Sequence, residues 1–190
     1  MIDPSQLYKT VLETERLLLR YPTLRDAKEV FTFCRDPRIS KYSAWDPHEN
    51  LAQTKRYLRY LRRIRKDGVE LTFCICRKSD GRVIGTCSFV RMDLEGRVGE
   101  VGYCIAADCW QQGYGSEAVA ALLDFGFQTL RFNRIEARVV QENRPSAALL
   151  EHLGFEKEGL LKNGVTFKGA PHDLFLYAVW RGQSPRFAAV

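Results

Sequence analysis

A short glycine-containing segment lies between a strand-like stretch and a helix-like stretch, and its residue types suit the binding of a phosphate group. Its sequence is Trp110-Gln111-Gln112-Gly113-Tyr114-Gly115-Ser116-Glu117-Ala118. Gly113 and Gly115 let the backbone turn sharply and approach a ligand closely. Unpaired amides at the start of the following helix, together with the helix dipole, favour an anion such as a pyrophosphate. Because such glycine pairs are also common in plain turns, the loop alone leaves both interpretations open.

The loop differs from the familiar nucleotide-binding motifs. No lysine follows the glycines as in a Walker P-loop. The three-glycine pattern of dinucleotide-binding proteins is absent, and the preceding strand belongs to a series of hairpins. Gly-x-Ser-x-Gly does not occur either, which argues against a serine hydrolase.

Further motifs flank the loop in a fixed order. They are Glu15-Arg16-Leu17-Leu18-Leu19-Arg20, Glu100-Val101-Gly102-Tyr103, Asn143-Arg144-Pro145-Ser146 and Leu153-Gly154-Phe155. With the loop, they resemble the GCN5-related N-acetyltransferases (GNAT), and most of all the RimJ/RimL-type branch that acetylates the N-termini of ribosomal proteins. The similarity covers roughly residues 12–181. Trp110 departs from the general pattern, which prefers Gln or Arg there, but this branch of the family tolerates the tryptophan.

The resemblance implies a binding site for acetyl-CoA as cosubstrate, with no metal. Its pyrophosphate would be held by the backbone of the loop, and the pantetheine arm would meet two residues near the sulfur. A splay between the strand ending near Ala106 and the strand starting near Arg134 would admit the thioester. The implied cosubstrate-binding residues are Gln111, Gln112, Gly113, Tyr114, Gly115, Ser116, Asn143 and Ser146.

Two residues are predicted to carry proton transfer. Glu100 is the candidate base, since direct acyl transfer needs a neutral amine; the alternative is a strand carboxylate paired with Arg91 or Arg138. Ser146 resembles the serine proposed as proton donor in the ribosomal branch, and its alternative is a residue that only binds the cosubstrate or caps a helix. The tyrosine acid of some N-terminal acetyltransferases is missing, because Leu150 stands at that position.

The elements that must position these residues follow from periodicity, caps and turn residues. The predicted order is strand, two helices, three strands, helix, strand, helix and two strands. The fold class is therefore α/β (α+β), a mixed and mostly antiparallel sheet of about seven strands flanked by helices, as in GNAT proteins. We expect one domain over residues 1–190, with a core at about 12–181. The predicted strands are Arg16–Arg20, Val69–Arg77, Val83–Val90, Val98–Ala106, Arg134–Val140, Phe155–Leu161 and Leu174–Trp180.

The helices have more specific start and stop signals. Thr23-x-x-Asp26 predicts a capping box for a helix to about Arg35, which Pro37 stops. The second helix is predicted to start at Asp46-Pro47, with Glu49 completing the cap, and to run to about Lys66 before Asp67-Gly68. Two more are predicted over Gly115–Leu130 and Pro145–Leu153, the latter ended by Gly154.

Composition narrows the class of protein. The chain has 190 residues, 29 basic and 23 acidic, for a net charge of +6, which suggests an anionic partner. No apolar stretch is long enough to span a membrane, and we expect a cytoplasmic protein. Cys74, Cys76, Cys87 and Cys104 are expected to be small buried hydrophobes. His48, His152 and His172 are too scattered to suggest a metal site.

Part of the charge lies on the second helix, where Lys55, Arg59, Arg62 and Lys66 form a ridge. A solvated surface is one interpretation; contact with ribosomal RNA or an acidic acceptor is the other. Trp45, Tyr42 and Tyr103 are the predicted acceptor-binding residues. The acceptor is predicted to be a protein N-terminal amine; the alternatives are a small amine (antibiotic, polyamine or amino acid) and a non-catalytic acyl-CoA-binding module on RNA. A monomer and a homodimer both stay open.

Overall fold

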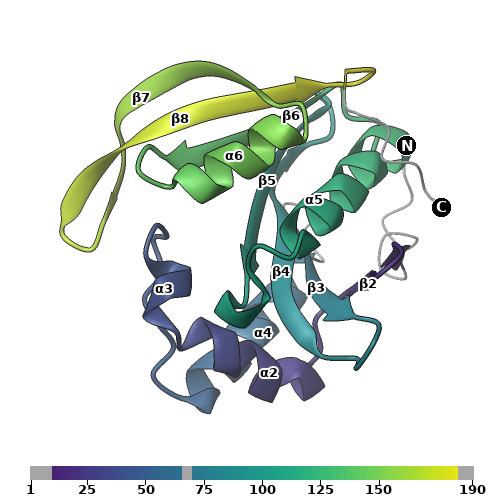
Figure 1. Cartoon of the computed structure of the whole chain (residues 1–190), viewed down its shortest axis with the longest axis vertical. Helices are drawn as coiled ribbons and strands as arrows, with labels where there is room; N and C mark the ends of the chain where they lie inside the picture. Colours follow the sequence, from purple (N-terminus) through teal and green to yellow (C-terminus); the bar gives the residue numbers. More distant parts are fainter. Residues whose placement is uncertain (1–9, 66–69, 184–190) are drawn as a thin grey trace.

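The computed structural model describes residues 10–65 and 70–183, and these residues form one eight-stranded sheet in the order β1-β2-β3-β4-β5-β6-β8-β7 (Figure 1). The strands are β1 (Leu12–Glu13), β2 (Leu17–Arg20), β3 (Leu71–Arg77), β4 (Val83–Asp93), β5 (Val98–Ile105), β6 (Arg134–Val140), β7 (Glu156–Phe167) and β8 (Ala170–Trp180). Neighbouring strands are antiparallel except β5 and β6, which are parallel. The predicted mixed, mostly antiparallel sheet is confirmed; the additional strand is the short β1.

Helices cover both faces of the sheet. They are η1 (Leu24–Asp26), α2 (Ala27–Cys34), α3 (Pro37–Ser40), α4 (Leu51–Ile64), η3 (Ala107–Cys109), α5 (Tyr114–Asp124), the π-helical η4 (Phe125–Thr129) and α6 (Arg144–His152). Alternation along β3 shows the division: Phe73 and Ile75 pack in the core with α5 and α6, whereas Cys74 and Cys76 pack with α2 and α4. The two faces of the sheet therefore carry separate hydrophobic cores.

The first helical region begins as predicted. The side chain of Thr23 accepts a hydrogen bond from the Arg25 amide, and the Asp26 carboxylate accepts one from the Thr23 amide, which completes the capping box. Pro37 follows the end of α2, but it also opens the short helix α3, which Asp36 caps. Proline suits both roles, because it lacks an amide hydrogen and its φ angle already fits a first helical turn.

The predicted start of the second helix was wrong. The helix α4 begins at Leu51, and the Asn50 side chain caps it by accepting a hydrogen bond from the Gln53 amide. Asp46 and Pro47 lie in the link before it, and the cap that forms is four residues after the predicted one, although Asp and Asn are similarly good N-cap residues. Lys66 and Asp67-Gly68, the predicted end of this helix, lie outside the described residues.

The β7–β8 hairpin is longer than predicted. Both strands extend to a tight turn in which Lys168 and Gly169 have φ angles of 51° and 78°. The outer part of β7 is an edge strand exposed along most of its length, so it lacks the alternation of apolar residues that marks a strand. The hairpin arches away from the rest of the sheet toward α3 (Figure 1).

Candidate active site

Strands β5 and β6 separate after three residue pairs, and this separation is the main feature of the site. The parallel pairs are Val98↔Arg134, Gly99↔Ile135 and Glu100↔Glu136, and no later pair joins these two strands. On their other sides the strands stay paired: β5 with β4 as far as Ile105, and β6 with β8 as far as Val140. The opening therefore begins at Glu100. It is the splay that the sequence led us to expect.

The loop before α5 follows the end of β5 that is no longer paired with β6. Gln111 and Gly113 both have left-handed backbone conformations, with φ angles of 59° and 80°. The helix α5 starts directly after this turn, at Tyr114. The first amides of the helix have no hydrogen-bond acceptor within the helix. A Cβ atom on Gly115 would lie 2.9 Å from Leu149 Cδ1, so the glycine also permits the close approach of α5 and α6. This geometry fits a pyrophosphate bound by backbone amides.

The N-terminal segment anchors that loop, a role that sequence analysis missed. Arg16 Nη1 donates to the Gln112 carbonyl at 2.9 Å, and its guanidinium forms a 2.6 Å ion pair with Glu117. Thr14 Oγ1 donates to the same carboxylate at 2.6 Å. Burial alone would raise the pKa of Glu117, but the hydrogen bonds from Thr14 and Arg16 outweigh it and lower the pKa. The sequence signal for this contact was that Arg16 lies in the motif Glu15–Arg20 and Glu117 lies in the loop motif Trp110–Ala118.

Two hydroxyl groups meet across the opening. Tyr103, on β5, places its Oη 2.8 Å from Ser146 Oγ on α6 and 3.2 Å from the Ser146 carbonyl. Asn143 caps α6 by accepting a hydrogen bond from the Ser146 amide at 3.4 Å. Burial raises the pKa of Tyr103 to about 12, so its hydroxyl stays protonated near neutral pH. The Tyr103 side chain, which is predicted to bind the acceptor, packs against the core under α5 and α6.

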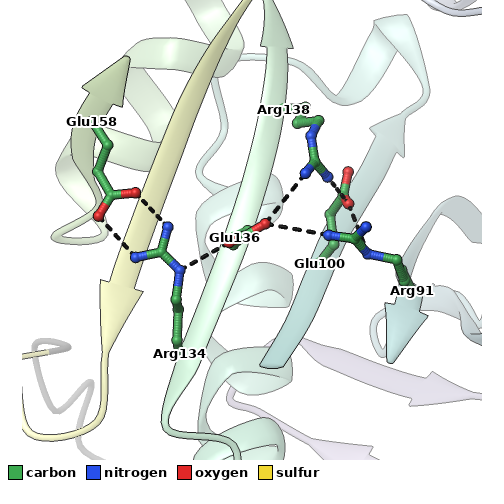
Figure 2. A network of polar contacts seen from close by, with 6 residues as sticks. All are labelled: Arg91, Glu100, Arg134, Glu136, Arg138 and Glu158. Carbon is green, nitrogen blue, oxygen red and sulfur yellow. Dashed lines mark hydrogen bonds and ion pairs between the residues drawn. The ribbon is translucent and has the colours of Figure 1, made fainter. Parts of the chain in front are cut away.

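A ladder of alternating charges crosses the strands at the vertex of the splay (Figure 2). Glu100 and Glu136 are neighbours in the parallel register, and Arg138 contacts both, reaching Glu136 at 3.4 Å. Arg91 lies 3.6 Å from the Glu100 carboxylate and 3.4 Å from that of Glu136. The arginines thus offset the repulsion between two adjacent carboxylates. At the other end of the ladder, Arg134 joins Glu136 to Glu158.

Glu100 has the arginine contacts that were considered as the alternative to catalysis, but they use only one of its oxygens. Among the described residues, its hydrogen bond runs from Arg138 to Oε2, and none reaches Oε1. The side chain is 15% exposed, and it shares a strand face with Gly102 and Cys104, which lies against the α2–α4 core. Tyr103 points to the opposite face. The carboxylate and the hydroxyl pair therefore lie on opposite faces of the sheet.

Trp45 and Tyr42, the two predicted acceptor residues in the link between α3 and α4, pack in different places. Tyr42 packs with Val140, Phe167 and Leu174 of the β6–β8 region, and the nearby Lys168 Nζ donates to the Ser40 carbonyl at 2.5 Å. Contact between the α3–α4 link and the hairpin therefore bounds the site on that side. Trp45 packs instead against the α2–α4 core, with its ring centroid 6.0 Å from that of His48.

His48 received no role from the sequence, yet it lies beside Trp45. Its Nδ1 is 2.8 Å from Thr54 Oγ1, and its ring meets Tyr57 edge-on at 5.8 Å. Burial lowers the pKa of His48, which favours the neutral ring at pH 7. No spacing signal pointed to this contact, because it joins the link to two positions on α4.

The site combines the separation of β5 from β6, the left-handed loop before α5, and two polar groups, Glu100 and Ser146, on opposite faces of the sheet. Together these features fit an acyl-CoA-dependent acyltransferase. The acetyltransferase (GNAT) domain family matches residues 16–156, so the chain belongs to the GNAT N-acetyltransferases. These enzymes use acetyl-CoA as acyl donor, and the loop and splay described above fit that cosubstrate.

Similar proteins agree with this assignment. An uncharacterised N-acetyltransferase, p20, from Bacillus licheniformis is 38% identical over 88% of this chain and 94% of its own length. The ribosomal protein uS5-alanine N-acetyltransferase of Escherichia coli is 27% identical over 92% and 93% of the two chains. The structure of Mycobacterium smegmatis RimJ in complex with CoA-disulfide superposes with a TM-score of 0.84 at 26% identity, covering 94% of this chain and 92% of that one. No helix within the described residues is long and apolar enough to cross a membrane.

Proposed function

We propose that this protein transfers the acetyl group of acetyl-CoA to the α-amine of a protein N-terminus, such as that of a ribosomal protein, by direct attack in a ternary complex. We further propose that it acts in the cytoplasm as one catalytic domain. The observation that carries the proposal is the position of Glu100, at the vertex of the splay with Oε1 free of hydrogen bonds from described residues. The resemblance to ribosomal-protein acetyltransferases supports the choice of acceptor.

The two faces of the sheet divide the proton transfers. The neutral amine attacks the thioester carbonyl, forming the C–N bond while the C–S bond breaks. A free α-amino group has a pKa near ~8, so a fraction is neutral at pH 7 and a modest base suffices. Glu100 Oε1 takes a proton from the amine, directly or through water. On the other face, Ser146 Oγ gives a proton to the departing thiolate and regains one through Tyr103 or solvent.

The test measures acetylation of an N-terminal peptide library and of a panel of small amines by the purified protein. Turnover of peptides with little turnover of antibiotics, polyamines or amino acids supports the proposed acceptor. Turnover of small amines alone would overturn it in favour of the same chemistry on a small molecule.

The role of Glu100 is tested with a matched pair of variants. We expect Glu100→Gln to lower kcat by about 10²-fold, with part of the loss recovered at higher pH. Glu136→Gln is the control, because Glu136 is the parallel neighbour of Glu100 and is similarly buried, with side chains 13% and 15% exposed. Equal losses in both variants would assign the network a structural role only.

A further inference from the structure

The net charge of the protein is concentrated on helix α4. Its 14 residues, Leu51–Ile64, include five basic side chains and no acidic one. The remaining chain has 24 basic and 23 acidic residues, so its charges nearly cancel. The overall excess of +6 is therefore mostly a property of one helix.

The basic side chains share one side of that helix. Lys55, Arg59 and Arg62 follow the spacing i, i+4, i+7, and Arg56 and Arg63 lie beside this row. All five are exposed, whereas Thr54, Leu58 and Leu61 on the other side are buried against the α2–α4 core. With a rise of 1.5 Å per residue, the row from Lys55 to Arg62 extends about 10 Å along the axis. We call these five residues the α4 basic face.

The α4 basic face also differs from the other arginines in its partners. Eight arginines elsewhere form ion pairs with aspartate or glutamate. Over residues 10–65 and 70–183, no carboxylate pairs with any of the five side chains of the α4 basic face; the contact that involves one of them is Arg63 over the Tyr60 ring. Five adjacent cations without counter-charges repel each other, and a polyanion would relieve that repulsion.

We infer that the α4 basic face binds the phosphate backbone of RNA, an inference that rests on the proposed ribosomal acceptor for its choice of RNA. Four of the five side chains are arginine, whose guanidinium binds phosphate through two parallel hydrogen bonds. The face bears no aliphatic side chain that would insert into a lipid surface, and its neighbour Tyr60 is 47% exposed. The face lies on a different helix from the loop and splay, so RNA and acetyl-CoA bind different parts of the protein.

The experiment measures binding of a fluorescently labelled single-stranded RNA of about 20 nucleotides by anisotropy, at several KCl concentrations. Five phosphate contacts predict that affinity falls roughly 10²-fold between 50 and 200 mM salt. Lys55→Glu/Arg59→Glu/Arg62→Glu should bind at least 30-fold more weakly and show a shallower salt dependence. Acetylation of a short peptide by this variant should stay unchanged, which also shows that it folds.

The matched control reverses three exposed basic residues elsewhere, Arg97, Arg131 and Lys162, none of which forms an ion pair with a described residue. It changes the net charge equally and should retain RNA affinity within about threefold. Equal weakening in both triple variants would overturn the inference, since net charge alone would then explain binding. Effective competition by poly-glutamate would overturn it in favour of an acidic protein, and tighter binding to DNA of the same sequence would overturn the choice of RNA. RNA binding requires no turnover. RNA binding without peptide acetylation would therefore refute only the proposed function and leave the RNA-binding inference standing.

Discussion

Arg138 on β6 contacts the carboxylate of Glu100 on β5 at the last residue pair before the two parallel strands separate. The same guanidinium lies 3.4 Å from Glu136, so one cation serves two adjacent carboxylates (Figure 2). Arg138 thereby holds Oε2 of Glu100, and no hydrogen bond from the described residues reaches Oε1. We interpret Arg138 as a positioning residue for the candidate base.

Removal of Arg138 should change the pH dependence of catalysis. We expect Arg138→Ala to shift the acidic limb of the kcat/KM profile upward by about one pH unit, because Glu100 then lies beside Glu136 with less positive charge nearby. Arg138→Lys should restore part of the original profile. The measurement is kcat/KM for peptide acetylation between pH 5 and pH 9.

Arg134→Ala provides the control for that prediction. Arg134 lies four residues before Arg138 on the same strand and face, and it contacts Glu136 and Glu158 but not Glu100. We expect this variant to lose stability without moving the profile. An unchanged profile in Arg138→Ala would assign Arg138 to structure alone.

Ser146 and Tyr103 should affect catalysis to different extents. If Ser146 Oγ protonates the thiolate, Ser146→Ala should lower kcat by roughly 10- to 10²-fold with little change in the KM for acetyl-CoA. Tyr103→Phe, which removes only the 2.8 Å partner of that hydroxyl, should cost less. Steady-state kinetics at varied acetyl-CoA concentration distinguish proton donation by Ser146 from cosubstrate binding by Ser146. A rise in KM with unchanged kcat would show that Ser146 only binds the cosubstrate.

The loop conformation is predicted to control acetyl-CoA binding. Gly113 has a φ angle of 80°, and a Cβ atom there would lie 3.2 Å from Arg16 Nη2. Gly113→Val should therefore distort the loop and weaken acetyl-CoA binding by at least tenfold, as measured by calorimetry. Gly81→Val is a control with similar backbone strain, because Gly81 has a φ angle of 73° and a Cβ atom there would meet no other atom within 4 Å. Unchanged affinity in Gly113→Val would refute the assignment of this loop.

Acid should destabilise the protein partly through Asp26. This buried carboxylate accepts hydrogen bonds of 2.9 and 2.6 Å from Arg20, and it also receives the Thr23 amide of the capping box. Burial would raise the pKa of Asp26, but the bonds from Arg20 and Thr23 lower it below the ordinary 3.8. The unfolded chain then binds the proton more readily, so this stabilisation is present above about pH 4 and is lost as pH falls further.

Asp26→Asn should lower the free energy of unfolding by about 2 kcal/mol at pH 7 and reduce its loss on acidification. Urea unfolding at pH 7 and pH 3 measures both effects. Asp36→Asn serves as a control, since Asp36 also caps a helix and pairs with an arginine, but its partner Arg38 is 68% exposed. If Asp26→Asn is as stable as Asp36→Asn, burial does not make the Arg20–Asp26 pair contribute more to stability than the exposed pair of Asp36 and Arg38.

Much of the fold could be predicted from local signals in the chain. The apolar periodicity, the Thr23–Asp26 capping box and Gly154 with its φ angle of 82° each report a conformation that neighbouring residues determine. Where competing local signals occurred, as at Asp46 and Asn50, tertiary packing of α4 decided which one starts the helix. The outer hairpin was underestimated because an edge strand buries little and carries no clear pattern.

By itself, the sequence determined the order of elements, the glycine loop and the set of candidate residues. These depend on residue type and short spacing, and backbone sterics translate them directly into structure. Only the tertiary structure decided the partners: Glu100 with Arg138, Tyr103 with Ser146, and Arg16 with Glu117. Those pairs join residues that are far apart in the chain. Their geometry depends on strand register, on the separation of β5 from β6 and on which face each side chain takes, and local sequence carries no direct record of these.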